Sequence, residues 1–95
     1  MPRRAARVDR NHGEIVEAAR KLGCLVWSTA PLGKGFPDLL IALPKRLGRR
    51  LVLCEVKDGT LPQSKRQLTP DEAKFASQWP VTLIESLDDL EAMLK

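Results

Sequence analysis

The sequence has few of the residues that catalytic triads, zinc sites and disulfide frameworks require. It contains one histidine, two cysteines and no tyrosine, and aromatic residues make up only 4% of the 95 residues. With His12 as the only histidine, neither a Ser/His/Asp triad nor a zinc site is expected, and no Gly-x-x-x-x-Gly-Lys loop for a nucleotide cofactor is present. Cys24 and Cys54 lie inside apolar runs, so we expect reduced, buried thiols and a cytoplasmic protein.

Long hydrophobic runs are also missing. The longest, at residues 39–43 and 51–54, are far shorter than the ~20 residues of a membrane-spanning helix. No apolar segment follows the basic N-terminus, so neither a signal peptide nor a membrane partner is expected. A chain of this length can bury one modest core. We therefore expect one domain at residues 9–95, preceded by a flexible basic arm at residues 1–8.

Positive charge is concentrated in the first half of the chain. The net charge is +4, but residues 1–50 carry +7 and residues 51–95 carry −3. A basic half favours a polyanion such as DNA as the partner, although a solvated surface with a frayed tail explains the charge equally well. If DNA binds, the candidate phosphate contacts are Arg3, Arg4, Arg7, Arg10, Lys34, Lys65 and Arg66.

The hydrophobic pattern predicts an α/β fold with the element order α-β-β-β-α-β-α. A first helix follows Asn11 and stops at Gly23, a second begins with the cap Thr69 before Pro70, and a third begins at Ser86. The expected strands cover residues 24–27, 38–43, 50–57 and 81–84. The few aromatic residues of these segments, namely Trp27, Phe75 and Trp79, are expected to lie in the core.

The strand at residues 50–57 combines apolar residues on both faces with a charged end. Its apolar residues predict a central strand covered on both sides. Glu55 and Lys57 share one face, because strand residues alternate. Burying such groups is costly unless they are paired or bind a metal. The simpler alternative is a solvated strand end with a weak ion pair.

The position of Asp38 favours a buried site in which the charged pair is paired or binds a metal, over a solvated strand end. If residues 38–43 and 50–57 form an antiparallel hairpin, Asp38 lies opposite Glu55 or Lys57, within side-chain reach. Two carboxylates and a lysine then meet at one edge of the sheet. Hard oxygen ligands of this kind suit Mg²⁺ or Mn²⁺.

Two motifs resemble a known family. Phe36-Pro37-Asp38 and the segment Cys54-Glu55-Val56-Lys57-Asp58-Gly59 resemble the signature of the PD-(D/E)XK nucleases. With the helix starts at residues 10–14 and 68–72, the chain resembles the stand-alone VRR-NUC branch of phages and prophages over about residues 10–94. The resemblance implies a restriction-endonuclease-like core, with a mixed central sheet flanked by helices. It also implies a homodimeric, metal-dependent endonuclease in a bacterial or phage-infected cell. The expected substrate is structured or branched DNA of the Holliday-junction or flap type.

The resemblance also assigns roles to residues. Asp38 and Glu55 would bind the metal together with the Val56 carbonyl, and Lys57 would orient water or stabilise developing charge. Glu14 matches the acidic ligand on the family's first helix, although it also stands at capping-box spacing from Asn11. The chain departs from many relatives at Glu72, where they place Gln. The capping box with Thr69 already explains this glutamate.

Two other functions stay open at this point. The chain could be a non-catalytic DNA-binding module that keeps a nuclease-like fold, or a structural or inhibitory domain that binds proteins. Metal-dependent cleavage separates the nuclease from both. Salt-sensitive DNA binding separates the two alternatives from each other.

Overall fold

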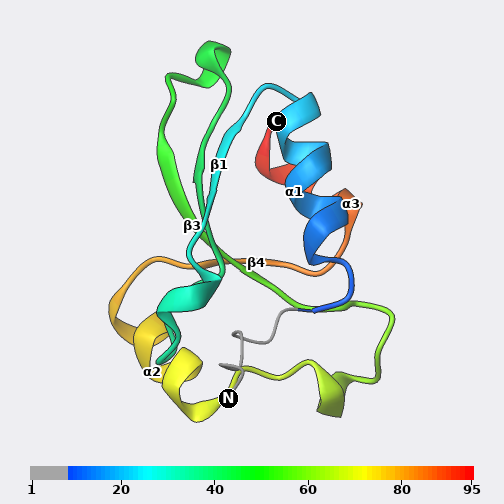
Figure 1. The fold of residues 1–95 in the computed structure, drawn as a ribbon, viewed down its shortest axis with the longest axis vertical. Helices are drawn as coiled ribbons and strands as arrows, with labels where there is room; N and C mark the ends of the chain where they lie inside the picture. Colours follow the sequence, from blue (N-terminus) through cyan, green and yellow to red (C-terminus); the bar gives the residue numbers. More distant parts are fainter. Residues whose placement is uncertain (1–8) are drawn as a thin grey trace, which may run out of the picture.

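The computed structural model describes residues 9–95 (Figure 1). The element order is the predicted one, α-β-β-β-α-β-α, with three 3₁₀ turns in the connecting loops. None of the described helices combines the length and the apolar composition needed to cross a membrane. The strands are β1 (Leu25–Ser28), β2 (Leu39–Ala42), β3 (Leu51–Val56) and β4 (Thr82–Ile84), and the helices are α1 (His12–Lys21), α2 (Pro70–Gln78) and α3 (Leu87–Met93).

The four strands form one mixed sheet in the order β1-β2-β3-β4. The first three pair antiparallel, and β4 pairs parallel with β3 after the chain has passed through α2. Leu39 pairs with Cys54. The next pair in this register sets Asp38 opposite Glu55, so the predicted hairpin geometry is confirmed.

One face of the sheet packs against α1 and α3, which lie side by side (Figure 1). The apolar stripe of α1 buries Ile15 and Ala19 completely, and Leu90 of α3 is also fully buried. Each large aliphatic side chain removed from water in this way contributes about 1.5–3 kcal/mol. The sheet adds Leu39, Ile41, Cys54, Val56 and Ile84 to the same core.

The other face of the sheet is largely open, which contradicts the prediction that β3 is covered on both sides. Leu51 is 66% exposed and Trp27 74% exposed. Trp79, at the end of α2, is 56% exposed, so placing Trp27 and Trp79 in the core was wrong. The reason lies in the position of α2. Phe75 of this short helix packs edge-on against Phe36, with ring centroids 5.2 Å apart, beside the loop that leads into β2. It leaves the middle of the sheet uncovered.

Most predicted helix ends are confirmed. Thr69 and Glu72 form the expected capping box, and Ser86 accepts a hydrogen bond from the Asp89 amide. Gly23 follows α1 with φ +95°. The exception is Asn11, which occupies the N-cap position of α1 but makes no capping hydrogen bond with its side chain. Both cysteines are free and buried, as expected.

Candidate functional site

The end of β3 opens into a pocket of about 490 Å³. It brings together three of the predicted catalytic side chains, those of Asp38, Glu55 and Lys57. The remaining lining includes three acidic residues that were not expected there, namely Asp9, Asp58 and Glu72. The sequence motifs at residues 36–38 and 54–59 therefore meet in one place, although they lie on different strands.

Asp38 is held rigidly at the start of β2. Its side chain is 9% exposed, and its Oδ2 accepts a hydrogen bond from the Val56 amide at 2.9 Å. Thr29 fixes the preceding backbone, since its hydroxyl donates to the Pro37 carbonyl at 2.6 Å and its amide donates to the Asp38 carbonyl at 2.8 Å. Asp38 therefore spans from β2 to the charged end of β3.

Glu55 is buried beside two other carboxylates. Only 3% of its surface is exposed, and its Oε2 lies 3.7 Å from the Lys57 ammonium. Burial, a hydrogen bond with Glu72 and the nearby Asp38 carboxylate raise the pKa of Glu55 to about 9. At neutral pH this group therefore requires a proton, or a cation in its place, to balance the surrounding negative charge.

Lys57 is positioned by Glu72. The lysine Nζ lies 2.9 Å from Glu72 Oε1, and the same oxygen accepts the Thr69 amide at 2.9 Å. Burial lowers the pKa of Lys57, but the hydrogen bond to Glu72 and the charges of Glu72 and Glu55 outweigh it, so the pKa is raised overall. The lysine thus stays charged. Glu72 serves both the helix cap and the site, so explaining it by the cap alone was incomplete.

Asp9 is a pocket residue that the sequence analysis missed. It is half-buried, and burial raises its pKa, with Lys57 opposing this shift and Asp38 adding to it. Asp9 stands just before α1, at a position that carries no motif or periodic signal. Only the packing of α1 against the sheet brings it to the end of β3, so no local pattern could have identified it.

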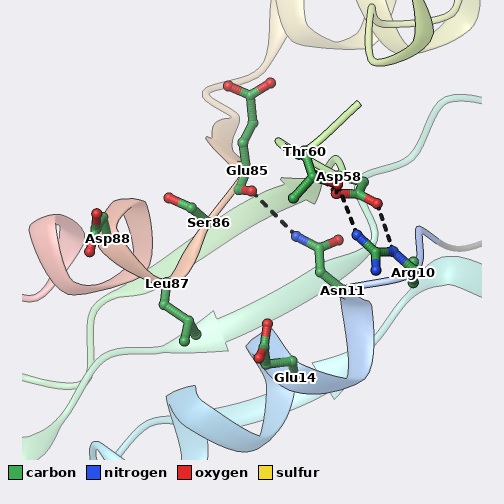
Figure 2. Close-up of a pocket in the computed structure, with 9 residues that line it drawn as sticks. All are labelled: Arg10, Asn11, Glu14, Asp58, Thr60, Glu85, Ser86, Leu87 and Asp88. Atoms are coloured by element: carbon green, nitrogen blue, oxygen red, sulfur yellow. Dashed lines mark hydrogen bonds and ion pairs between the residues drawn. The ribbon is translucent and has the colours of Figure 1, made fainter. Parts of the chain in front are cut away.

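Glu14 lies elsewhere. It is exposed on α1 and lines a neighbouring pocket of about 520 Å³ with Asn11 and Asp88 (Figure 2). Arg10 and Asp58 line both pockets, and they are joined by an ion pair of 3.1 Å. The structure therefore does not bring Glu14 together with Asp38 and Glu55 in one pocket.

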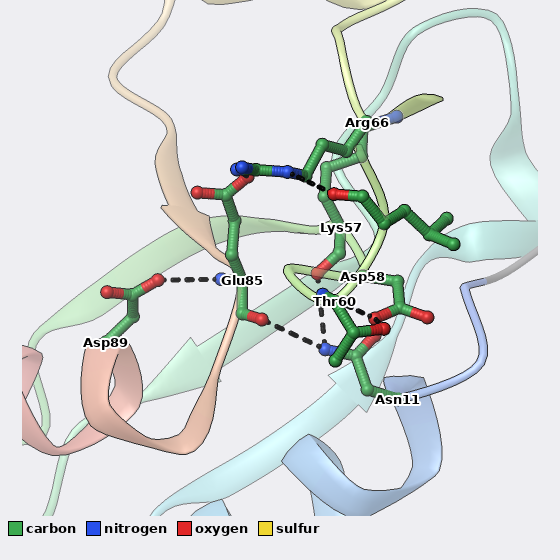
Figure 3. A network of polar contacts seen from close by, with 8 residues as sticks. Asn11, Lys57, Asp58, Thr60, Arg66, Glu85 and Asp89 are labelled. Atoms are coloured by element: carbon green, nitrogen blue, oxygen red, sulfur yellow. Dashed lines mark hydrogen bonds and ion pairs between the residues drawn. The ribbon is translucent and has the colours of Figure 1, made fainter. Parts of the chain in front are cut away.

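Asn11 ties α1 to the ends of two strands. Its Nδ2 donates to the Lys57 carbonyl at 3.2 Å and to the Glu85 carbonyl at 3.4 Å (Figure 3). The Gly59 amide also donates to the Glu85 carbonyl, at 3.1 Å. The Asn11 side chain, which was expected to cap a helix, instead fixes the backbone directly after β3 and directly after β4.

The predicted phosphate contacts fall into three groups. Arg10 donates to Asp58 and Thr60 (Figure 2), and Arg66 pairs with Glu85 at 2.6 Å (Figure 3), so both already hold the loop after β3 in place. Lys34 and Lys65 are exposed. The remaining candidates, Arg3, Arg4 and Arg7, lie outside the described residues.

The chemistry of the donor set fits a hard divalent cation. Within residues 9–95, no group of three or more His, Cys, Asp or Glu side chains is already arranged as a metal site. Asp38 and Glu55 nevertheless face one pocket, and the raised pKa of Glu55 reflects first its burial and then the neighbouring carboxylates, whose negative charge a cation would balance. Carboxylate oxygens are ligands that Mg²⁺ and Mn²⁺ accept. Val56, the third predicted ligand, is completely buried and is not among the residues that line the pocket.

Glu55 and Lys57 thus lie at the end of a central strand, opposite a fixed aspartate and under the first turn of α2. Comparisons of this chain with protein-family models, with curated proteins and with solved structures give no match.

Proposed function

We propose that this protein is a Mg²⁺- or Mn²⁺-dependent DNA endonuclease with a PD-(D/E)XK core of the VRR-NUC type. The observation that carries the proposal is the meeting of Asp38, Glu55 and Lys57 in one pocket, where Asp38 accepts the Val56 amide and Lys57 donates to Glu72. A solvated strand end with a weak ion pair would not bury Glu55 to 3% exposure. The arrangement supports a catalytic interpretation of the pair.

The residues supply what phosphodiester hydrolysis requires. A divalent ion held by Asp38 and Glu55 would lower the pKa of a water and neutralise phosphate charge. Lys57 brings a fixed ammonium to the pocket, where it stabilises negative charge as it develops on the phosphate oxygens. Glu72 acts through Lys57 by holding it in place, and Asp9 adds a carboxylate at the pocket.

The substrate in this proposal is DNA that is held through its phosphates. The exposed ammonium groups of Lys34 and Lys65 and the basic residues of the N-terminal segment suit a polyanion. A structured or branched DNA, such as a flap or a four-way junction, remains the substrate class that the family resemblance suggests. The arrangement of the basic residues does not resemble a recognition helix that reads base edges.

A cleavage panel tests the proposal. Linear, flap, splayed and four-way DNA substrates are incubated with Mg²⁺, Mn²⁺ or EDTA. Asp38→Asn, Glu55→Gln and Lys57→Ala should each lower the rate by about 10²–10³, the usual loss for one positioned electrostatic group. Glu17→Gln, at an exposed position of α1, is the matched control and should keep full activity.

Two outcomes would contradict the proposal. Cleavage that persists in EDTA rules out a requirement for a metal ion. Full activity of the Glu55→Gln variant rules out this pocket as the catalytic site. Salt-sensitive DNA binding without cleavage of any substrate would instead favour the non-catalytic DNA-binding module.

A further inference from the structure

Trp27 stands on the face of the sheet that α1 and α3 leave uncovered (Figure 1). It is the most exposed large hydrophobic residue in the part of the chain that the structure describes. It belongs to β1, an edge strand that is joined only to β2 within the described sheet. An aromatic side chain in a core ordinarily buries about 150–250 Å². Packing among residues 9–95 therefore does not account for a tryptophan at this position.

The strand register places Trp27 beside the candidate site. Trp27 pairs with Leu40, and Leu40 pairs with Leu53. Asp38 stands two residues before Leu40, and Glu55 two residues after Leu53, so the two carboxylates share the face of Trp27. Diagonal neighbours in such a ladder, here Trp27 and Asp38, are about 7–8 Å apart. The indole therefore lies within reach of anything bound at Asp38.

The surface next to Trp27 is apolar and accessible. Leu40 and Leu53 are half-buried, whereas Leu39 and Ile41 point to the opposite face and lie in the core. We call Trp27, Leu40 and Leu53 the platform. It carries no charge and presents one aromatic ring with two aliphatic side chains in the same row of the sheet. A flat heteroaromatic ring is the ligand chemistry that suits such a surface.

We propose that the platform holds an unpaired nucleobase of the strand that is cut, stacked on the indole of Trp27. The proposal rests on the proposed function for one point, namely that the scissile phosphate lies at Asp38 and Glu55. A base is joined to its phosphate through one sugar, so a ring on Trp27 belongs to a nucleotide at or next to that phosphate. Stacking on an aromatic side chain accepts any base, because every base has a π face.

The pairing state of the DNA decides whether it can use the platform. In a duplex both faces of a base are covered by its neighbours, so only an unpaired or splayed base presents a ring to a side chain. The exposed Lys34 lies in the loop that connects β1 with Asp38, where it can neutralise a phosphate of such a strand. The platform therefore favours DNA with single-stranded nucleotides beside the cut, as in a flap, over a fully paired four-way junction.

Tryptophan fluorescence tests the platform without cleavage, with Ca²⁺ in place of Mg²⁺. Trp79→Phe leaves Trp27 as the only tryptophan and keeps an aromatic ring against Phe75. A single-stranded oligothymidylate of about eight nucleotides should quench the Trp27 emission as a base stacks on the indole. A blunt duplex of the same length and an abasic oligomer of the same length should leave the emission nearly unchanged.

The affinities of variants identify the residue that the base contacts. Trp27→Ala should weaken oligothymidylate binding about 10- to 100-fold, and Trp27→Phe, which retains a ring, should recover most of this loss. The abasic oligomer should bind the wild type and Trp27→Ala about equally. The matched control is Leu51→Ala, an exposed leucine on the same face and about 13 Å along β3 from Glu55, which should change the affinity less than about twofold.

Three results would overturn the platform: Trp27 emission that no single strand quenches, equal quenching by the blunt duplex, or Trp27→Ala that binds like the wild type. A loss in Leu51→Ala as large as that in Trp27→Ala would overturn it too, because the contact would then be a general apolar one. The nuclease and the platform fail separately. Cleavage with unchanged binding by Trp27→Ala rejects the platform alone, whereas base-dependent quenching without cleavage supports the platform and rejects the nuclease.

Discussion

At the scale of single residues, the site depends on side chains that hold the catalytic ones. Glu72 accepts the Thr69 amide and the Lys57 ammonium with the same oxygen, each at 2.9 Å. The start of α2 and the position of the lysine are thereby coupled, because neither contact can move without straining the other. Asp38 is restrained in a comparable way by the Val56 amide.

Replacing Glu72 should separate its two roles. Glu72→Ala removes the partner of Lys57. We expect the rate at saturating DNA to fall by up to about tenfold and the free energy of unfolding to fall by about 1 kcal/mol. Glu72→Gln keeps an acceptor for both Thr69 and Lys57, so it should restore most of the rate and the stability. The measurements are single-turnover cleavage and urea unfolding. Equal rates for the wild type and Glu72→Ala would leave Glu72 as a helix cap only.

Substitutions of Asp9 and Glu14 should give different results in the same cleavage assay. Asp9 lines the pocket with Asp38 and Glu55, whereas Glu14 lines the adjacent one. Asp9→Asn should therefore raise the Mg²⁺ concentration needed for half-maximal cleavage by about tenfold, since a carboxylate near the cation is lost. Glu14→Gln should leave it unchanged. The reverse pattern would restore Glu14 as the acidic group of the first helix.

At the scale of elements, local sequence signals predicted the helices, strands and their order well, but they did not predict which faces of the sheet the helices cover. The caps at Thr69 and Ser86 were found because both partners of a cap lie within four residues in the sequence. The placement of Asp38 opposite the charged end of β3 was predicted because an antiparallel hairpin sets the start of its first strand beside the end of its second. Trp27 was misplaced because its burial depends on where α2 packs, and strand periodicity carries no information about that.

The contact of Asn11 with two strand ends could not be predicted from the sequence for a similar reason. An asparagine just before a helix can either cap that helix or donate to distant carbonyls, so its type and position do not distinguish the two roles. The sequence shows the asparagine and its place before α1, but not the Lys57 and Glu85 carbonyls that compete for its amide.

The loop after β3 is joined tightly to the end of β4, and Gly59 tests that junction. A Cβ atom at this position would lie 2.6 Å from the Glu85 carbonyl oxygen, closer than Cβ atoms in proteins come to other heavy atoms. Gly59→Ala should therefore lower the free energy of unfolding by about 1–3 kcal/mol, as overpacking usually does. Gly13→Ala is the matched control: it lies in α1 with open space around it, and it should be neutral or gain up to about 1 kcal/mol. Similar unfolding midpoints for both variants would show that the junction yields easily.

At the scale of the whole molecule, the uneven charge is the feature that most concerns a nucleic-acid partner. Among the predicted phosphate contacts, Arg10 and Arg66 are engaged within the fold, whereas Lys34 and Lys65 are exposed. The first eight residues add Arg3, Arg4 and Arg7 to the basic half of the chain. The share of DNA affinity contributed by this segment can be measured independently of cleavage.

Deleting residues 1–8 should make DNA binding less sensitive to salt. Each phosphate that a protein neutralises contributes about −0.9 to the slope of log K against log salt for duplex DNA, so losing three arginines should make the slope shallower by up to about 3. Affinity should fall by a similar factor for every DNA sequence, because phosphates carry no base information. The slope is measured with Ca²⁺ or EDTA to prevent cleavage, and the rate at saturating DNA should change little. If the slope stays the same, the contacts lie within residues 9–95, and Lys45→Ala and Lys65→Ala then distinguish the turn after β2 from the loop after β3.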